Sequence, residues 1–454
     1  MKNIVYLIVF SIIIGCSSKT ETLKTTDDVL TKSIDSIMNA NYLPNEPGAA
    51  IIISKNGKET YSKGFGMANL ELNVPMKSEM IFRLGSITKQ FTAVSILLLE
   101  EQSKLSVKDD ICKYLPEYPT HDDIITIENL LTHTSGIPNF TGFPNGFEIE
   151  QMKLTTTELL DLFKDKPLDF KTGERFSYSN SGYAVLGAII ESVSKMSYEE
   201  FIEIEIFEKL GMKSSSYDHP EEVVKNKISG YDKDSLGYRK ADYSTMCAPF
   251  SAGALRSNVK DLALWNKSIH GGKLIQLKSL VKAFKPFKLN SGELSNYGFG
   301  WQAQAFMGHT NYHHAGGIFG FLTSGFYFPE EDLYVAVLSN NTSSNPELVN
   351  SLISSKLLDE SESHSVNKDN LLNLTGTYVI DNSNIEITKD SNELYFDATW
   401  KKGKLIARSN EEFYVDGTIM GCTFNQDSTG IVKSITIKHR FFGDKWYTAN
   451  RILE

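Results

Sequence analysis

The chain has 454 residues, of which 41% are hydrophobic and 22% charged, so it is long enough for two domains with a substantial core. Its formal net charge is −10, and no block of basic residues stands anywhere in the sequence. Because binding to nucleic acid needs a concentrated positive surface, these features exclude a nucleic-acid partner.

The N-terminus has the pattern of an export signal, because a lysine follows the initial methionine and a long apolar run comes next. The run ends in Ile13-Ile-Gly-Cys16, which resembles a bacterial lipobox, although Ile13 stands where Leu is usual. We therefore expect a lipoprotein signal peptide over 1–15, lipidation at Cys16 and a tether over 16–25. The protein would then be exported and anchored to a bacterial membrane, facing the periplasm. A plain signal peptide or a single membrane anchor is the alternative.

The next elements predict an α+β domain over 26–357. Apolar residues recur at helical spacing in 26–38, and 49–54 begins a hairpin whose tight turn is Asn56-Gly57. Further helical patterns cover 87–98, 184–193 and 257–269, and strand patterns cover 321–328 and 333–340. Strands at both ends with helices between them indicate an antiparallel sheet, built from the two ends of the domain, with a helical insert covering one face.

The composition changes after this domain. Residues 358–370 are polar and are expected to form a linker. About seven short β-like runs follow in 371–454, from GTYVI to VKSITIKHR, with turn residues between them. This pattern predicts a small C-terminal antiparallel barrel or sandwich.

Context distinguishes one Ser-x-x-Lys segment from the others. The spelling begins at Ser86, Ser192, Ser257, Ser279 and Ser365. Ser192 is expected inside a helix, Ser257 at a helix cap, Ser279 before a polar surface stretch and Ser365 in the linker. Before Ser86, in contrast, Gly85 permits a sharp turn, and an apolar helix follows.

Ser86 and Lys89 form a candidate nucleophile and base. Residues three apart at the start of a helix share a face, so the Lys89 amine can reach the Ser86 hydroxyl. Serine needs an adjacent base, and lysine serves only when neutral. Lowering a lysine pKa from about 10.4 to about 7 takes roughly 4.6 kcal/mol, which burial can supply. The alternative is a capping serine beside a lysine whose ammonium reaches solvent.

A second motif, Tyr178-Ser-Asn180, stands directly before another predicted helix and is the sole Tyr-x-Asn in the sequence. A tyrosine beside a lysine ammonium could be ionised at modest cost and could relay the serine proton to a leaving group. Asn180 offers both a donor and an acceptor for a substrate amide. The alternative is a helix-capping turn in which Tyr178 only packs.

A third motif, His314-Ala-Gly316-Gly317, precedes the strongest strand pattern. Glycines there let a ligand or another backbone approach the sheet edge closely. The adjacent pair of histidines, 313 and 314, does not indicate a metal site, because neighbouring strand residues point to opposite faces. We expect no metal and no cofactor.

These three motifs, in this order, resemble those of the penicillin-recognising serine hydrolases: class C β-lactamases, DD-peptidases of the penicillin-binding-protein type, D-aminopeptidases and related esterases. The resemblance covers roughly residues 27–357. Residues 371–454 weakly resemble the lipocalin-like barrel that is appended to some of these hydrolases. Further segments resembling the family are NLLTHTSGIPNF (129–140), KTGERFSYSNSGY (171–183), SAGALRSNVKDLALW (251–265) and YGFGW (297–301).

The resemblance implies roles for the reacting residues. Ser86 would be the acylated nucleophile, with Lys89 and Tyr178 as the proton-transfer pair. The backbone N–H groups of Ser86 and Gly317 would form the oxyanion hole. The implied fold is a β-lactamase/transpeptidase-like α+β domain.

The resemblance also implies substrate contacts, from Asn180, His314 and Gly316. His133 falls in a family loop that is structural rather than catalytic. His314 takes the place of a lysine that binds substrate carboxylates, and histidine is mostly neutral at pH 7. This departure weakens the case for an efficient β-lactamase.

We therefore expect a serine hydrolase that cleaves amide or ester bonds of a small-molecule or peptide substrate: a β-lactam, a D-peptide or an ester. A catalytically inactive, lipid-anchored binder of cell-wall peptides is the alternative. A third hypothesis gives the main role to the C-terminal barrel, as a partner-binding or glycan-binding module.

Overall fold

The computed structural model describes residues 26–358, 371–380, 383–416, 418, 420–439 and 445–452. The expected signal peptide, Cys16, the tether and all of the linker except Leu358 lie outside these residues. Among the described residues, no helix has both the length and the hydropathy that a membrane crossing requires.

The first domain is built on a six-stranded antiparallel sheet in the order β10-β11-β12-β13-β1-β2. The N-terminal hairpin forms one side of this sheet: β2 is the edge strand, and β1 pairs with β2 and with β13 from the other end of the domain. This confirms the predicted sheet made from both ends of the domain. The strands are β1 (Ala49–Lys55), β2 (Lys58–Phe65), β10 (Gln302–Phe306), β11 (His309–Ile318), β12 (Phe321–Phe328) and β13 (Leu333–Ser339).

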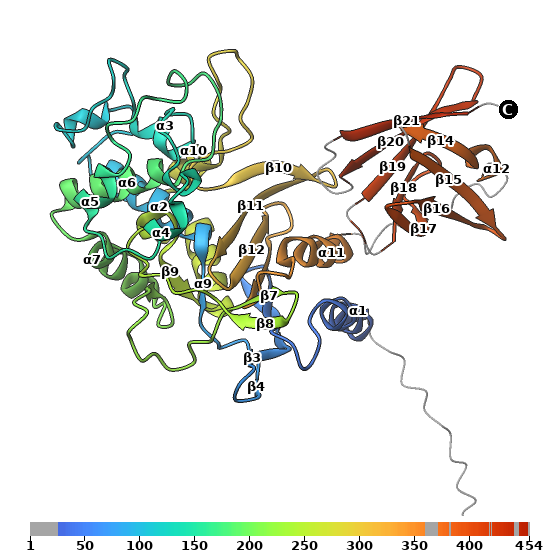
Figure 1. The fold of residues 1–454 in the computed structure, drawn as a ribbon, viewed down its shortest axis with the longest axis horizontal. Coiled ribbons are helices and arrows are strands. Elements are labelled where there is room, and N and C mark those ends of the chain that lie inside the picture. The colour runs from blue at the N-terminus through green and yellow to red at the C-terminus, as the bar shows by residue number, and fades with distance from the viewer. Residues whose placement is uncertain are drawn as a thin grey trace, which may run out of the picture.

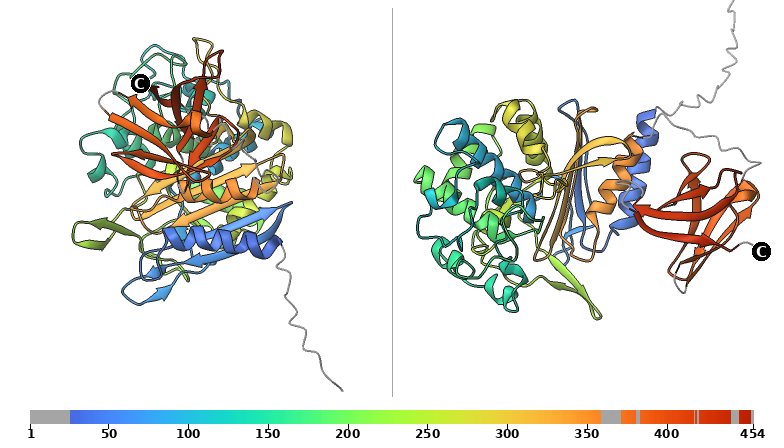
Figure 2. Two further views of the ribbon diagram at one scale, coloured as in Figure 1. Left: turned by 90° about the vertical axis from the view of Figure 1, so that its right-hand side faces the viewer. Right: turned by 90° about the horizontal axis from the view of Figure 1, so that it is seen from above.

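Helices cover both faces of the sheet (Figure 2, right panel). Helices α1 (Thr26–Asn41) and α11 (Pro346–Leu358) pack together on one face. There Ile51 and Ile53 join one apolar cluster, whereas Ala50 and Ile52 point into the larger cluster formed with the insert on the other face. Because β1 is buried on both sides, its sequence is a continuous apolar run rather than an alternating one.

The insert between β2 and β10 carries the remaining helices and short strands (Figure 1). Its central helix is α2 (Thr88–Glu101), which is buried on every side from Thr88 to Leu99, in keeping with the apolar helix expected after Ser86. The other helices are α3 (Ile127–Leu131), α4 (Gly146–Ile149), α5 (Thr156–Asp161), α6 (Asn180–Ser194), α7 (Tyr198–Ile202), α8 (Phe250–Gly253), α9 (Val259–His270) and α10 (Leu277–Phe284). The short strands are β3 (Met67–Asn69), β4 (Val74–Pro75), β5 (Phe82–Arg83), β6 (Ser216–Tyr217), β7 (Tyr231–Asp234), β8 (Gly237–Lys240) and β9 (Leu255–Ser257).

One short sheet leads the chain to the predicted nucleophile. Strand β9 lies between β5 and β6, and Phe82 of β5 pairs with Ser257 of β9. The prediction that Ser257 caps a helix is wrong by one residue: Asn258 caps α9, and its side chain accepts a hydrogen bond from the Asp261 N–H. Ser257 instead ends the strand, where its hydroxyl lies 2.7 Å from the Ser215 hydroxyl.

The C-terminal part is a closed antiparallel barrel, as predicted, with its own apolar interior. Inward and outward positions alternate along its strands, as in Glu393–Ala398. The sequence interpretation missed the last strand, β21, which closes the barrel against β14. The elements are α12 (Leu371–Leu374), β14 (Gly376–Ile380), β15 (Ser383–Asp390), β16 (Glu393–Ala398), β17 (Lys401–Ala407), β18 (Glu412–Val415), β19 (Met420–Gln426), β20 (Val432–His439) and β21 (Lys445–Arg451).

Candidate active site

Ser86 lies in a single 3-10 turn, Gly85–Ile87, that leads directly into α2. Gly85 has a φ of +55°, which most other residues adopt only with strain. A Cβ atom on Gly85 would also lie 2.8 Å from the backbone nitrogen of Gly317. The glycine therefore permits both the sharp turn and the close approach of β11 to the nucleophile.

The Lys89 amine lies at the centre of the site, one helical turn beyond Ser86. Its Nζ is 3.1 Å from Ser86 Oγ, 2.8 Å from Asn180 Oδ1 and 2.9 Å from the backbone oxygen of Ala252. The side chain is fully buried. The structure thus brings together two of the predicted motifs and rules out the alternative in which the Lys89 ammonium reaches solvent.

These neighbours suit a neutral amine. Burial holds the pKa of Lys89 well below its ordinary value. A neutral amine has two N–H donors and one lone pair, and two of its three neighbours, the Asn180 and Ala252 oxygens, can only accept. The lone pair is left for the Ser86 hydroxyl, which can donate. Lys89 is therefore positioned as a base toward Ser86.

Tyr178 lies next to both Ser86 and Lys89. Its ring centroid is 4.8 Å from the Lys89 Nζ. Burial raises the pKa of Tyr178, and a hydrogen bond with Ser86 offsets only part of that rise. Burial therefore opposes ionisation of Tyr178, against the expectation that a neighbouring lysine ammonium lets the phenol ionise at modest cost.

Asn180 is the first residue of α6, and Ser179 caps the helix by accepting from the Gly182 N–H. The Asn180 side chain accepts from Lys89 through Oδ1 and donates to Thr141 Oγ1 through Nδ2, at 3.2 Å. Its backbone N–H donates to Asn139 Oδ1. These contacts fix the amide beside Ser86.

His133 supports this motif from behind. Its Nδ1 accepts a hydrogen bond from the Ser179 N–H at 3.1 Å, and its ring packs 4.3 Å from that of Tyr178. The side chain is buried, and burial holds its pKa well below the ordinary value. This geometry agrees with the structural role expected for His133.

His314 lies in β11, with both ring nitrogens engaged. Nδ1 is 2.6 Å from the Ala315 oxygen, which can only accept, so Nδ1 carries the proton and Nε2 accepts from the Tyr297 hydroxyl at 2.8 Å. Burial and the nearby Lys89 lower the pKa of His314 to about 3. The side chain is therefore neutral at pH 7. His313 packs against Phe326 in the cluster on the opposite face, as the alternation of strand residues predicts.

Gly316 and Gly317 bring β11 against the nucleophile. A Cβ atom on Gly316 would lie 2.1 Å from the Leu84 oxygen and 3.0 Å from the Ser86 nitrogen. Strand β10 pairs with β11 only as far as His313, so β10 leaves the edge from His314 onward uncovered. In the β11–β12 hairpin, Gly317 pairs with Leu322, one residue pair before the two-residue turn. This is a non-hydrogen-bonded pair, so the Gly317 N–H points away from β12.

The hollow at the nucleophile is small and is bordered by segments from the insert and from β11. Asn139 and Tyr297 received no role from the sequence, although both lie in segments that resemble the family, NLLTHTSGIPNF and YGFGW. Thr141 and Glu150 lie outside those segments, and no local pattern marks them. The lining residues are Ser86, Phe140, Thr141, Glu150, Asn180, Pro249, Ala252, Gly253, Gly317 and Ile318.

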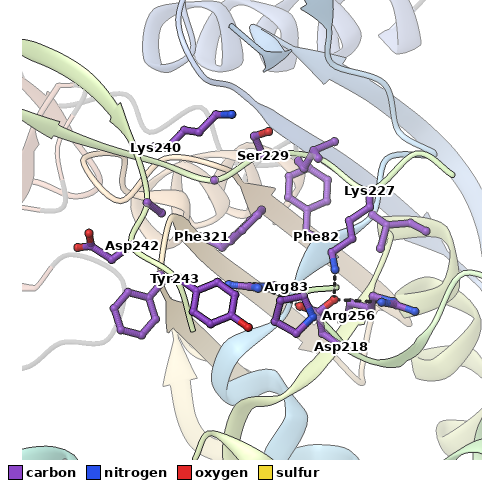
Figure 3. A pocket seen from close by; sticks show the side chains of 16 residues that line it. Phe82, Arg83, Asp218, Lys227, Ser229, Lys240, Asp242, Tyr243, Arg256 and Phe321 are labelled. Carbon is purple, nitrogen blue, oxygen red and sulfur yellow. Dashed lines mark hydrogen bonds and ion pairs between the residues drawn. The ribbon is translucent and has the colours of Figure 1, made fainter. Parts of the chain in front are cut away.

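A larger cavity, of about 280 Å³, lies beside the site rather than at Ser86 (Figure 3). Within it Asp218, which is fully buried, binds Arg83 at 2.8 Å, Lys227 at 2.6 Å and Arg256 at 3.1 Å. Arg83 and Arg256 come from the paired strands β5 and β9. These ion pairs anchor β5, which ends three residues before Ser86.

No group of three or more His, Cys, Asp or Glu side chains in the described part of the chain is arranged to hold a metal ion. The site itself presents the Ser86 and Tyr178 hydroxyls and the Lys89 amine.

Comparison with known proteins gives concordant results. Penicillin-binding protein 4* of Bacillus subtilis is 31% identical over 268 residues, which are 56% of this chain and 59% of that protein. The octameric penicillin-binding protein homologue of Pyrococcus abyssi has a TM-score of 0.64 and 27% identity, covering 93% of this chain and 99% of its own. The structure of D-amino acid amidase from Ochrobactrum anthropi SV3 aligns with a TM-score of 0.65 over 74% of this chain and 100% of the amidase chain. At 21% identity, this similarity shows a shared fold.

The chain thus spans about six tenths of the length of its Bacillus relative and nearly all of the archaeal structure. The family described as Beta-lactamase matches residues 41–353, which contain every residue of the site described above. The chain belongs to the β-lactamase family.

Proposed function

We propose that the protein is a serine hydrolase that cleaves amide or ester bonds through an acyl-enzyme on Ser86. One observation carries this proposal: the buried Lys89 amine has two neighbours that only accept and a third, the Ser86 hydroxyl, that can donate. A lysine held in this way can take the serine proton at neutral pH.

In the proposed reaction, Ser86 Oγ bonds to the substrate carbonyl carbon while Lys89 Nζ takes the hydroxyl proton. Negative charge collects on the carbonyl oxygen, toward which the Ser86 and Gly317 N–H groups donate. The C–N or C–O bond to the leaving group breaks, and the Tyr178 hydroxyl protonates that group and regains a proton from Lys89. Water then attacks the ester carbonyl, releasing the acid and restoring the Ser86 hydroxyl.

The neutral His314 bears on the substrate. A permanent cation at this position would attract the carboxylate of a β-lactam or of a D-Ala terminus, but the imidazole is uncharged and its nitrogens are engaged with Tyr297 and Ala315. The proposal therefore favours peptidase, amidase or esterase activity over efficient hydrolysis of β-lactams. The related D-amino acid amidase is consistent with this choice.

Intact-mass analysis after treatment with a fluorophosphonate tests the proposal. We expect a single adduct, located on the peptide that contains Ser86. An unmodified protein under conditions that label a control serine hydrolase would contradict the proposal and favour the inactive binder of cell-wall peptides. A panel of nitrocefin, D-Ala-D-Ala peptides, D-amino-acid amides and p-nitrophenyl esters then separates the activities.

We propose in addition that the protein is an exported lipoprotein attached to a bacterial membrane through Cys16. Support comes from the apolar run and the lipobox-like Ile13-Ile-Gly-Cys16. Expression of the full chain in a bacterium, followed by detergent phase partition, tests this proposal. The wild type is expected in the detergent phase and Cys16→Ala in the aqueous phase, whereas equal partition of the two would contradict lipidation.

A further inference from the structure

The cavity shown in Figure 3 has an apolar wall as well as a charged one. Phe82 and Phe321 belong to the apolar wall, and their rings pack edge to face at 6.4 Å. Lys240 and Tyr243, whose side chains are exposed, line the cavity where it meets solvent. Its volume of about 280 Å³ is close to the lower end of the range for small-molecule sites.

The charges that line this cavity do not cancel. The lining carries four cationic side chains and two carboxylates, namely Arg83, Lys227, Lys240 and Arg256, and Asp218 and Asp242. Three of them have partners from outside the lining: Lys240 pairs with Glu71, Asp242 with Arg239 and Arg256 with Glu222. Arg83 and Lys227 remain against the single carboxylate of Asp218. The cavity thus keeps one positive charge in excess, in a chain whose net charge is −10.

Arg83 has unused hydrogen-bond donors. Its Nε donates to Asp218 at 2.8 Å, but Nη1 and Nη2 form no hydrogen bond with a described residue. Lys227 donates to the His219 oxygen and pairs with Asp218, which leaves one of its three N–H donors without an acceptor among the described residues. The Arg83 side chain is only 13% exposed, and enclosed donors without an acceptor cost free energy. A carboxylate is the natural acceptor, because its two oxygens match the two Nη groups of a guanidinium.

The cavity lies next to the catalytic hollow and is separate from it. Arg83 stands three residues before Ser86, so their Cα atoms are no more than about 11 Å apart. At the β11–β12 turn, Ile318 lines the hollow and the next residue, Phe319, lines the cavity. His314 lines neither of them. A cation that meets a ligand in this cavity is therefore not a substitute at the His314 position.

We propose that this cavity binds the carboxylate of an organic acid, which is either a separate molecule or the far end of a substrate held at Ser86. The carboxylate accepts from Nη1 and Nη2 of Arg83 and from Lys227, and the apolar part of the acid packs against Phe321. Its single negative charge balances the excess positive charge of the lining. Binding of a separate acid does not depend on acyl transfer by Ser86, whereas the substrate-borne case rests on the proposed function.

A pair of probes of nearly equal shape tests the site directly. para-Fluorobenzoate carries a carboxylate where para-fluorobenzamide carries a neutral amide, and fluorine NMR titration at constant ionic strength gives both dissociation constants. In the wild type, the benzoate is expected to bind on the order of 10-fold more tightly, the usual size of a hydrogen bond to a charged group. In Arg83→Gln this ratio should fall toward one, and Asp218 keeps Lys227 and Arg256 as partners. In Arg175→Gln, which changes an exposed arginine outside the cavity, the ratio should stay at the wild-type value.

Equal binding of the two probes by the wild type, or an unchanged ratio in Arg83→Gln, would overturn the inference. If a melting curve shows that Arg83→Gln does not fold, Lys227→Gln takes its place with the same expectation. Fluorobenzoate binding in a protein whose Ser86 resists the fluorophosphonate would overturn the proposed function alone.

The source of the carboxylate is identified with para-nitrophenyl monoesters of adipic, suberic and sebacic acids, compared with the corresponding methyl diesters. Faster turnover of a monoester than of its diester, lost in Arg83→Gln, assigns the carboxylate to the substrate. Equal turnover across the series, with the benzoate preference retained, assigns it to a separate molecule.

Discussion

Two Ser-x-x-Lys segments lie side by side in this molecule and have opposite surroundings. Strands β5 and β9 pair with each other, and each leads into a helix, with Ser86 and Lys89 after the first and Ser257 and Lys260 at the second. Lys89 is fully buried and contacts Ser86. The Lys260 side chain is 42% exposed and lies 3.9 Å from Glu79.

The serines differ as well. The Ser86 hydroxyl lines an open hollow, whereas Ser257 is fully buried and its hydroxyl pairs with that of Ser215. The same Ser-x-x-Lys pattern, on paired strands, thus gives the proposed nucleophile in one place and a buried structural contact in the other. The two segments differ in whether the lysine is buried and whether the serine is accessible, and the four-residue pattern predicts neither property.

The largest expected effect separates the two serines. Ser86→Ala should remove fluorophosphonate labelling and lower turnover by a factor of about 10⁴ or more, as for other serine nucleophiles. Ser257→Ala should keep labelling at Ser86 and lose only stability, because its hydroxyl bonds to Ser215 and the Asn258 oxygen. If Ser86→Ala were still labelled, Ser86 would not be the nucleophile, and the proposed difference between Ser86 and Ser257 would be wrong.

The lysines should differ nearly as much. Lys89→Met removes the amine without burying a permanent charge, and it should slow Ser86 acylation by about 10²- to 10⁴-fold, the usual contribution of a general base. Lys260→Met should change the acylation rate by less than about twofold, because an exposed ion pair contributes little. Stopped-flow measurement with an activated ester gives both rates, and near-wild-type acylation in Lys89→Met would exclude Lys89 as the base.

The approach of β11 to Ser86 makes a third contrast. Gly316→Ala places a Cβ atom 2.1 Å from the Leu84 oxygen, so the strand or the nucleophile turn must move. A stability loss of at least about 3 kcal/mol is expected, with reduced acylation. In Gly142→Ala the new Cβ meets no atom within 4 Å, so this variant is the control. Urea unfolding measures both, and equal midpoints would contradict the close contact.

The smallest expected effect is the loss of stability at acidic pH. Burial lowers the pKa of His313 and of His314 to about 3, below the ordinary value of 6.5. The unfolded chain therefore binds more protons between those values, so stability is fully present above pH 6.5 and is lost as pH falls toward 3. At pH 5 each histidine should lower the free energy of unfolding by about 2 kcal/mol relative to neutral pH, as measured by urea unfolding. His313→Gln should reduce this slope, and an unchanged slope would refute the assignment.

Local patterns were sufficient for elements whose neighbours are close in sequence. The hairpin with the Asn56-Gly57 turn, the helix after Tyr178-Ser-Asn180 and the strands of 321–340 were predicted, because turn residues and periodicity determine them. Ser86, Lys89, Tyr178 and Asn180 were brought together as expected. The roles of Gly316, Gly317 and His314 in binding or catalysis stay predictions.

The remaining features depend on tertiary contacts. Closure of the barrel by β21 depends on a partner strand, β14, at the other end of that domain. The ion pairs around Asp218 could not be found, because their cations come from segments far apart in the sequence. Burial opposes ionisation of Tyr178, and the Tyr-x-Asn pattern does not encode that burial.

The pairing of β1 with β13 has a consequence for the order of assembly. Gly48 donates a hydrogen bond to Asn340, 292 residues later, so the central sheet forms only after most of the domain exists. Such long-range pairing slows folding. Ser86 is made early, but Gly317 and Gly316 come with the late strands. A chain that is still being synthesised therefore has Ser86 but not the strand that carries Gly316 and Gly317. The proposed hydrolytic activity would then appear only once the sheet is complete.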